Sequence, residues 1–154
     1  MQAPSPRKRL PRAENGLSRV CSGALKIFVV ITDDDSTAVT SQEFDTEIRD
    51  ELAARFPGAP EQSYVFHAII GMAAKPDGTI WQPDEPVQSA TCTPGAQSAG
   101  AVYQRLSIAT GGLRFPLCNV HDDDPSNDDF GTIISAIAAE AGAGPPRCSG
   151  DVPG

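Results

Sequence analysis

The sequence of 154 residues is poor in aromatic side chains, has two histidines and lacks any long apolar segment. Two histidines at these places do not build a Ser-His-acid arrangement, and no glycine-rich phosphate loop is present. The longest apolar run, Ile27–Ile31, is far shorter than the ~20 residues needed to cross a bilayer. These absences argue against a serine hydrolase, a P-loop nucleotidase and a membrane-spanning chain.

What is present is typical of one globular domain with many loops. Hydrophobic residues make up 40% and charged residues 21%, close to globular averages. Glycine and proline number 14 each, so much of the chain should be turn, loop or tail. We expect a single modest core.

Charge is distributed unevenly along the chain. Residues 1–26 hold six of the twelve basic residues and one acid, a balance of +5, whereas the remainder holds six basic and nineteen acidic residues, a balance of −13. An acidic body repels phosphate backbones, so we expect no nucleic-acid binding by the folded part.

The four cysteines show neither C-x-x-C nor histidine spacing, which argues against zinc or thiol redox chemistry. An even number permits disulfides; Cys92 with Cys118 is the favoured pair, although three full pairings are open. Cysteines in even number suggest an extracytoplasmic protein, but the polar residues 10–23 do not form an export signal. The compartment is therefore left open.

The chain divides into a disordered basic leader (1–23), an α/β domain (24–141) and a Gly/Pro-rich tail (142–154). Ile27–Ile31 is apolar on both faces, which predicts a buried parallel strand. Ser41 should cap a helix that ends at Pro57-Gly58, and Tyr64–Ile70 should form the second strand. Strand, helix and strand in this order predict a parallel sheet.

The second half of the chain predicts a long loop over residues 71–98, a helix over Ala99–Thr110 and a short edge strand over Leu113–Leu117. A closing helix carries an apolar stripe of Phe130, Ile133, Ile134 and Ile137. Three strands are few for a Rossmann-like sheet. We therefore expect an incomplete sheet that self-associates through the exposed Ile27–Ile31 edge.

Three adjacent carboxylates, Asp33, Asp34 and Asp35, follow the first strand. Ligands of open α/β sheets bind at the carboxyl ends of strands, and hard oxygen ligands suit Mg²⁺, Mn²⁺ or Ca²⁺. The structural alternative is a solvated turn in which an acid caps the next helix.

The run Phe28-Val29-Val30-Ile31-Thr32-Asp33 resembles the fourth strand of a von Willebrand factor type A (vWA) domain, where the aspartate belongs to the metal-ion-dependent adhesion site. Tyr103–Gly112, ending in Thr-Gly-Gly, is similar to the penultimate helix and turn of that family. The resemblance covers roughly residues 24–140 and corresponds only to the carboxyl-terminal half of such a domain.

The resemblance implies a non-enzymatic domain that recognises a protein or surface ligand through a divalent cation, Mg²⁺ or a similar ion. Only Asp33 matches a metal-site position, where the family's aspartate usually acts through water. The family's Asp-x-Ser-x-Ser loop is absent from this sequence. The resemblance therefore implies an incomplete metal site, and a truncated fragment without independent function is a further alternative.

Asp33-x-Asp35-x-Thr37 behind an apolar strand also resembles the first motif of haloacid-dehalogenase-type phosphohydrolases. There the first Asp, Asp33, would be the nucleophile and the second the general acid/base, with Mg²⁺ required. A positioned lysine and further acids are needed, for which Lys75 and Asp122–Asp124 are the available groups.

Three other features have a structural interpretation, and two of them also have a functional one. A second acidic cluster, His121–Asp124 with Asp128-Asp129, suits calcium or, more often, a solvated loop before a helix. His67 lies within an apolar strand and is expected to be a core histidine. Trp81 in the long loop is either an anchor for a partner or a cover over the core.

Overall fold

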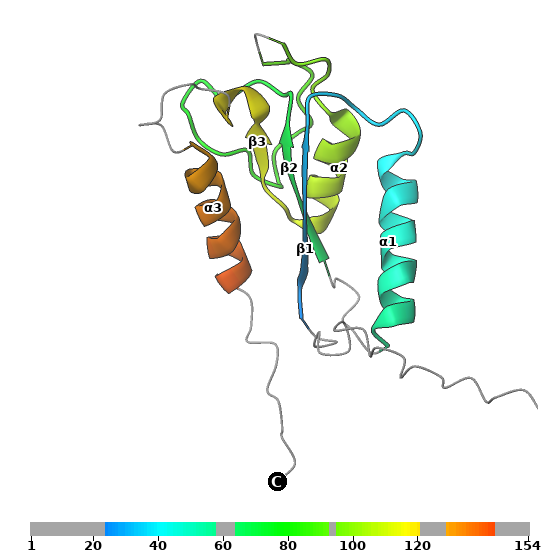
Figure 1. The fold of residues 1–154 in the computed structure, drawn as a ribbon. Helices are drawn as coiled ribbons and strands as arrows, with labels where there is room; N and C mark the ends of the chain where they lie inside the picture. Colours follow the sequence, from blue (N-terminus) through cyan, green and yellow to red (C-terminus); the bar gives the residue numbers. More distant parts are fainter. Residues whose placement is uncertain (1–23, 58–63, 93–94, 121–128, 144–154) are drawn as a thin grey trace, which may run out of the picture.

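Three parallel strands and three α-helices make up the part of the chain that the computed structural model describes, residues 24–57, 64–92, 95–120 and 129–143 (Figure 1). In chain order the elements are β1 (Lys26–Thr32), α1 (Ser41–Arg55), β2 (Tyr64–Ile70), α2 (Ala101–Thr110), β3 (Arg114–Pro116), a 3₁₀ helix (Leu117–Val120) and α3 (Asp129–Ala143). The leader, most of the tail and the acidic residues 121–128 lie outside the described residues.

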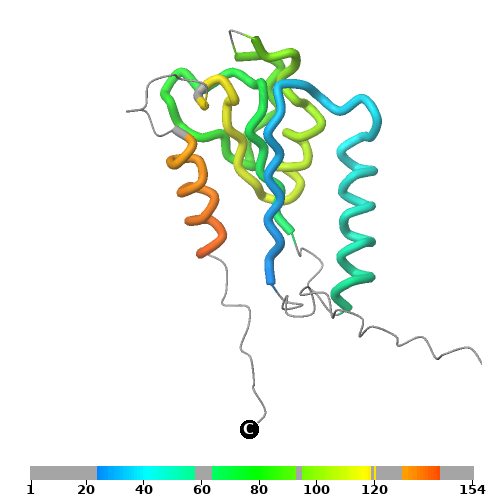
Figure 2. The backbone as a smooth tube through the Cα atoms, in the orientation of Figure 1, coloured from blue at the N-terminus to red at the C-terminus, as the bar shows by residue number. Residues whose placement is uncertain are grey.

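The strands form one sheet in the order β1-β2-β3, with β2 in the middle. β1 and β2 are parallel from Lys26 opposite Tyr64 to Thr32 opposite Ile70, and β3 is parallel to the last three residues of β2. The backbone returns through a helix after β1 and after β2, with α1 and α2 on one face of the sheet and α3 on the other (Figure 2). The expected α/β class and parallel sheet are confirmed.

α1 begins one residue earlier than a Ser41 cap would place it. Thr40 is the N-cap: its side chain accepts the Glu43 N–H at 3.2 Å, and the Glu43 carboxylate accepts the Thr40 N–H at 2.8 Å. This reciprocal capping box needs an acid three residues after the cap, which Thr40 has and Ser41, followed by Phe44, does not. The helix ends at Arg55, just before Pro57, as expected.

The core between the sheet and α1 and α2 is built from aromatic and aliphatic side chains. Tyr64 and Phe66 of β2 are buried, and Phe28 packs edge-on against Tyr64 with ring centroids 5.6 Å apart. The ring of Phe66 packs edge-on against that of Phe44 of α1, with centroids 5.8 Å apart. It is stacked on the ring of Tyr103 of α2, with centroids 6.4 Å apart. Both helices are therefore held to this face of the sheet by ring contacts from β2.

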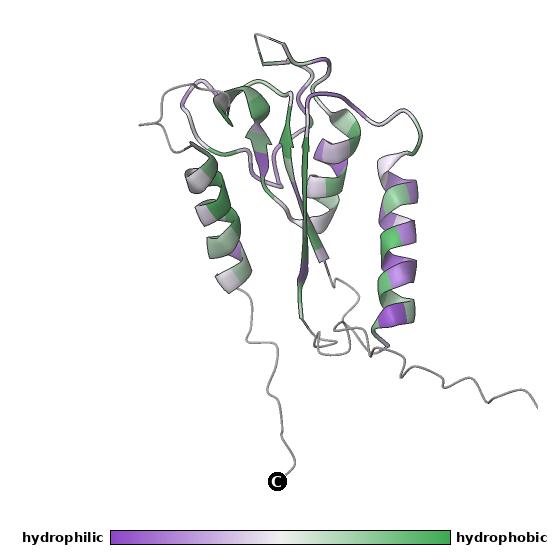
Figure 3. Ribbon diagram, viewed as in Figure 1, coloured by the Kyte–Doolittle hydropathy of each residue, from purple (hydrophilic) through white to green (hydrophobic). Residues whose placement is uncertain are grey.

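α3 is largely apolar (Figure 3) and packs on β2 and β3 through Ile133 and Ile137. It leaves the same face of β1 uncovered: Ile27, Val29 and Ile31 are 39%, 41% and 55% exposed. The expectation that this strand is buried on both faces is therefore wrong. Its apolar residues are typical of a covered strand, but no described element covers one side of them.

α2 begins at Ala101, two residues after the expected start. Gly100 precedes it with a left-handed φ of +66°, and a Cβ at this position would lie 3.1 Å from the Ile70 side chain. The side of α2 that is fully buried is polar, with Gln104, Ser107 and Thr110 at 0% exposure, whereas Ala109 is exposed. The spacing of Val102, Tyr103, Leu106 and Ala109 predicts an apolar face for this helix, which is correct at Leu106 and wrong at Ala109.

Two glycines end α2 for different reasons. Gly111 has a φ of +79° and caps the helix. Gly112 passes the β2 backbone so closely that a Cβ would lie 2.0 Å from the Phe66 carbonyl oxygen. β3 is an edge strand, as Pro116 predicts, but it is shorter than expected because the chain turns into the 3₁₀ helix at Leu117.

Candidate functional site

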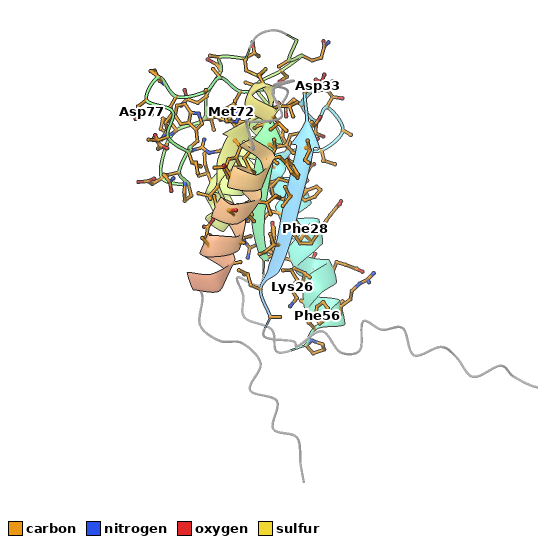
Figure 4. The ribbon with its side chains drawn as sticks, turned by 60° about the vertical axis from the view of Figure 1, so that its left-hand side comes forward. Lys26, Phe28, Asp33, Phe56, Met72 and Asp77 are labelled. Carbon is orange, nitrogen blue, oxygen red and sulfur yellow. A yellow bond between two sulfur atoms is a disulfide. The ribbon has the colours of Figure 1, made fainter. Side chains whose placement is uncertain are left out.

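The carboxyl ends of the strands lie together at one edge of the sheet, at the top of Figure 1, beneath the loops that follow β1 and β2. In parallel α/β sheets this edge is where ligands bind, because loops from several strands converge there. Asp33 is the first residue after β1 and lies at this edge (Figure 4).

The other two acids of the run are used for local structure. The Asp34 carboxylate accepts the Asp35 N–H at 2.7 Å. The Asp35 carboxylate accepts the N–H of Ser36 and that of Val102 in the first turn of α2, both at 3.0 Å. Asp35 thus caps α2 from 67 residues away, a role that the Gly100 N-cap cannot perform with a side chain.

The Asp33 side chain is exposed, and the hydrogen bonds at this residue are made by its backbone carbonyl. The Asp33 carbonyl accepts the N–H groups of Gln97 and Ser98 at 2.9 and 3.0 Å. Gly71 permits this approach, since a Cβ there would lie 2.3 Å from the Ser98 carbonyl oxygen and 3.2 Å from that of Asp33. The loop before α2 is therefore pinned to the end of β1, and the Asp33 side chain faces solvent.

An open hollow of about 590 Å³ lies beside Asp33. Its walls come from the end of β1, the loop before α2 and the 3₁₀ helix. They are formed by Ile31, Thr32, Asp33, Gly95, Ala96, Leu117 and Cys118. One carboxylate beside two aliphatic side chains makes this hollow partly apolar and locally anionic.

The residues that surround Asp33 do not fit a tightly held divalent ion. Within the described ranges, no group of three or more His, Cys, Asp or Glu side chains is arranged to hold a metal. An ion such as Mg²⁺ takes about six oxygen ligands, and Asp34 and Asp35 already accept backbone hydrogen bonds. The second acidic cluster lies outside the described residues except for the backbone of Asp129.

Lys75, the lysine available to the phosphohydrolase interpretation, is bound within the long loop. Its ammonium lies 2.6 Å from the Glu85 carboxylate, donates to the Ile80 carbonyl at 3.0 Å and sits 4.9 Å from the centre of the Trp81 ring. The hydrogen bond from Lys75 lowers the pKa of Glu85.

Trp81 covers the core, and Arg114 holds the loop around it. The Trp81 indole N–H donates to the Ala73 carbonyl at 3.0 Å. Arg114 is fully buried, and its guanidinium donates to the carbonyls of Pro86 and Glu85 at 3.1 and 2.8 Å, to that of Gln82, and to the Gln104 side chain at 3.3 Å. Sequence reasoning missed Arg114; its one signal was a lone charge within an apolar strand.

His67 is a core histidine, as expected, and is 1% exposed beneath α3. Its Nδ1 accepts the Leu113 N–H at 3.0 Å, and burial lowers its pKa. Glu140 Oε2 lies 3.8 Å from the same Nδ1, and burial raises the pKa of Glu140. Because Nδ1 is an acceptor here, the two groups do not form a charged pair through that atom.

Cys92 and Cys118 form a disulfide with an S–S distance of 2.01 Å, the pairing that the sequence favoured. The bond ties the end of the long loop to the 3₁₀ helix beside the hollow. Cys21 and Cys148 lie outside the described residues.

Comparison with models of protein families, with curated proteins and with solved structures found no match to this chain. Within the described ranges, no helix has the length and apolar character needed to span a bilayer.

Proposed function

We propose that the chain is a non-enzymatic, vWA-like recognition domain that binds a protein or surface ligand at the carboxyl-terminal edge of its Rossmann-like sheet. The observation that carries this proposal is the exposed Asp33 carboxylate at the rim of an open hollow with partly apolar walls. The resemblance of the strand before Asp33 and of the Thr110-Gly111-Gly112 turn to that family supports it.

The chemistry of the hollow selects a class of ligand. Ile31 and Leu117 offer aliphatic surface, and Asp33 offers one negative charge. The balance of −13 over residues 27–154 adds long-range attraction for cations. The ligand that fits is a protein segment in which an apolar side chain stands next to lysine or arginine.

A divalent cation has a minor place in this proposal. Asp33 is the one position that matches the family's metal site, and the described residues include no group of three or more His, Cys, Asp or Glu side chains arranged to hold a metal. We expect Mg²⁺ or Mn²⁺ to bind this chain alone with a Kd on the order of 10⁻³ M or weaker.

Two contacts favour recognition over phosphoryl transfer. The Asp35 carboxylate, which would act as general acid/base, caps α2, and the Lys75 ammonium is bound by Glu85 and Ile80. Neither group is left free to serve a substrate held at Asp33.

Panning a displayed random-peptide library on the immobilised chain tests the proposal. The selected peptides should combine an aliphatic or aromatic residue with Lys or Arg and bind Asp33→Asn about tenfold more weakly, the loss of roughly one charge-assisted contact. Asp50→Asn, which removes an exposed carboxylate from α1, is the matched control and should bind like the unmodified chain.

Equal affinity of the selected peptides for Asp33→Asn and the unmodified chain would contradict the site. Mg²⁺-dependent turnover of an aryl phosphate, abolished by Asp33→Asn, would overturn the non-enzymatic assignment.

A further inference from the structure

Within the described residues, β1 has an unpaired edge and an exposed face. In the described part of the chain it pairs with β2 alone, so the backbone groups of its outer edge have no partner strand there. Ile27, Val29 and Ile31 are also exposed on one face of the strand. An edge that is both unpaired and apolar is a template for another strand.

The exposed face of β1 is the one on which α3 lies. Val29 is opposite His67 and Ile31 is opposite Ile69, and paired residues of adjacent strands share a face. Ile69 packs against Ile133 of α3. The exposed stripe on β1 therefore continues a face that α3 already covers over β2 and β3.

We propose that the occupant of this edge is a second copy of the chain, paired through β1 in antiparallel orientation about a two-fold axis at Val29. The three strands of each copy then form one continuous sheet. This inference goes beyond the proposed function and does not rest on it.

The residue pattern of β1 is self-complementary in this arrangement. With Val29 opposite Val29, Ile27 lies opposite Ile31 and Phe28 opposite Val30, so every pair joins side chains of the same face. The seven residues of β1 provide a ladder about 23 Å long at ~3.3 Å per residue.

The charges at the two ends of β1 also favour the antiparallel orientation. Lys26 begins the strand, with its ammonium 4.2 Å from the centre of the Phe56 ring, and Asp33 follows its end (Figure 4). Asp34 is the next residue in the chain. Antiparallel pairing brings Lys26 of each copy opposite Thr32 of the other and next to its acids. A parallel, in-register copy would instead place like charges side by side.

Closure gives a third reason. A two-fold axis uses both free β1 edges and ends the assembly at two copies, which is the commonest form of soluble oligomer. The remaining sheet edges belong to β3, which has three residues and ends in Pro116. Proline on a short edge strand limits further pairing.

Sedimentation of the full chain tests the inference. We expect a mass about twice 16.1 kDa at micromolar concentration. Val29→Lys places two ammonium groups opposite each other at the axis and should give a monomer with an unchanged circular dichroism spectrum. Val87→Lys, which changes another exposed apolar residue in the long loop, is the matched control and should leave the dimer intact.

A second pair of variants tests the orientation. Ile27→Glu should raise the dimer Kd about 100-fold, because each interface loses two apolar contacts. The double variant Ile27→Glu/Ile31→Lys should recover most of that loss, since Glu and Lys then lie opposite each other twice in the antiparallel ladder alone.

Four results would overturn the inference. They are a monomeric unmodified chain, a dimer indifferent to Val29→Lys, open-ended assembly in place of a dimer, and a complex with a different polypeptide that protects the β1 amides from exchange while no dimer forms. Sedimentation is measured without any peptide, so this inference and the proposed function can fail separately.

Discussion

The two faces of the sheet are covered to different extents. On one face, α1 and α2 cover β1 and β2, the long loop covers Arg114 of β3, and Tyr64, Phe66 and Ala68 are at most 4% exposed. On the other face, α3 covers β2 and β3 and leaves Ile31 of β1 at 55% exposure. Adjacent strands lie about 4.8 Å apart and a helix is about 10 Å across, so one helix covers roughly two strands.

Because of this difference, apolar side chains on the first face should contribute mainly to the stability of the chain, and those of β1 on the second face mainly to interactions with other molecules. On the face of α1 and α2, apolar side chains are removed from water and contribute to the free energy of unfolding. On the other face, similar side chains of β1 contribute little to the stability of a single chain and remain available for association. Substitutions on the two faces should therefore give different results.

The largest expected effect comes from Arg114, which lies on the same face of the sheet as α1 and α2. Arg114→Ala leaves the carbonyls of Gln82, Glu85 and Pro86 without their buried donor, and should lower the free energy of unfolding by about 4 kcal/mol. Urea unfolding measures it. Arg55→Ala on α1, whose pair with Glu51 is more than half exposed, should cost about 0.5 kcal/mol or less. Equal losses for the two variants would show that the Arg114 contacts do not hold the loop.

A pair of aliphatic truncations compares the two faces directly. Leu106→Ala removes a side chain that is 1% exposed in the core under α2, and should cost about 3 kcal/mol. Ile134→Ala removes one that is 43% exposed on α3, and should change stability by about 0.5 kcal/mol or less. Thermal and urea unfolding measure both. A large loss for Ile134→Ala in a monomeric sample would mean that the second face is more closed than described.

The smallest expected effect depends on pH and lies beneath α3. Burial raises the pKa of Glu140 above the ordinary value of 4.5, so the folded chain binds more protons than the unfolded chain just above pH 4.5. Its contribution to stability therefore falls as pH rises through that window. Glu140→Gln should stabilise the chain at pH 7 by about 0.5 kcal/mol, after discount for solvent screening, and by less at pH 4.

His67 makes the free energy of unfolding change with pH in the opposite direction. Burial lowers its pKa below 6.5, so the unfolded chain binds more protons below pH 6.5 and stability falls as pH decreases there. Urea unfolding of Glu140→Gln at several pH values separates the two slopes, with Glu47→Gln on the exposed side of α1 as control. If Glu140→Gln raised the free energy of unfolding equally at pH 4 and pH 7, the raised pKa of Glu140 would not be its cause.

Local patterns predicted the elements that depend on nearby residues. The apolar strand after Lys26, the helix before Pro57, the strand Tyr64–Ile70 and the end of α2 at Thr110 all follow from neighbours in the chain. The start of α1 was misplaced because Ser41 and Thr40 are both acceptable caps, and only the position of Glu43 decides between them.

The buried polar face of α2 could not be found from apolar spacing. Thr110 accepts the Phe66 N–H at 2.9 Å and donates to the Leu106 carbonyl at 2.8 Å. Gln104 donates to the carbonyls of Gln88 and Ala99 and accepts the Gln88 N–H. Buried polar groups are tolerated when each has a partner, and two of these partners, Phe66 and Gln88, come from other segments of the chain.

The sequence by itself determined the α/β class, the parallel direction of the strands, the position of Asp33 at the end of the first strand and the favoured cysteine pair, because these depend on apolar runs, turn residues and order along the chain. The tertiary structure alone decided that Asp35 caps α2, that Arg114 gathers the long loop and that one face of β1 is exposed. Each of these depends on which distant segment lies next to a residue, and only packing settles that.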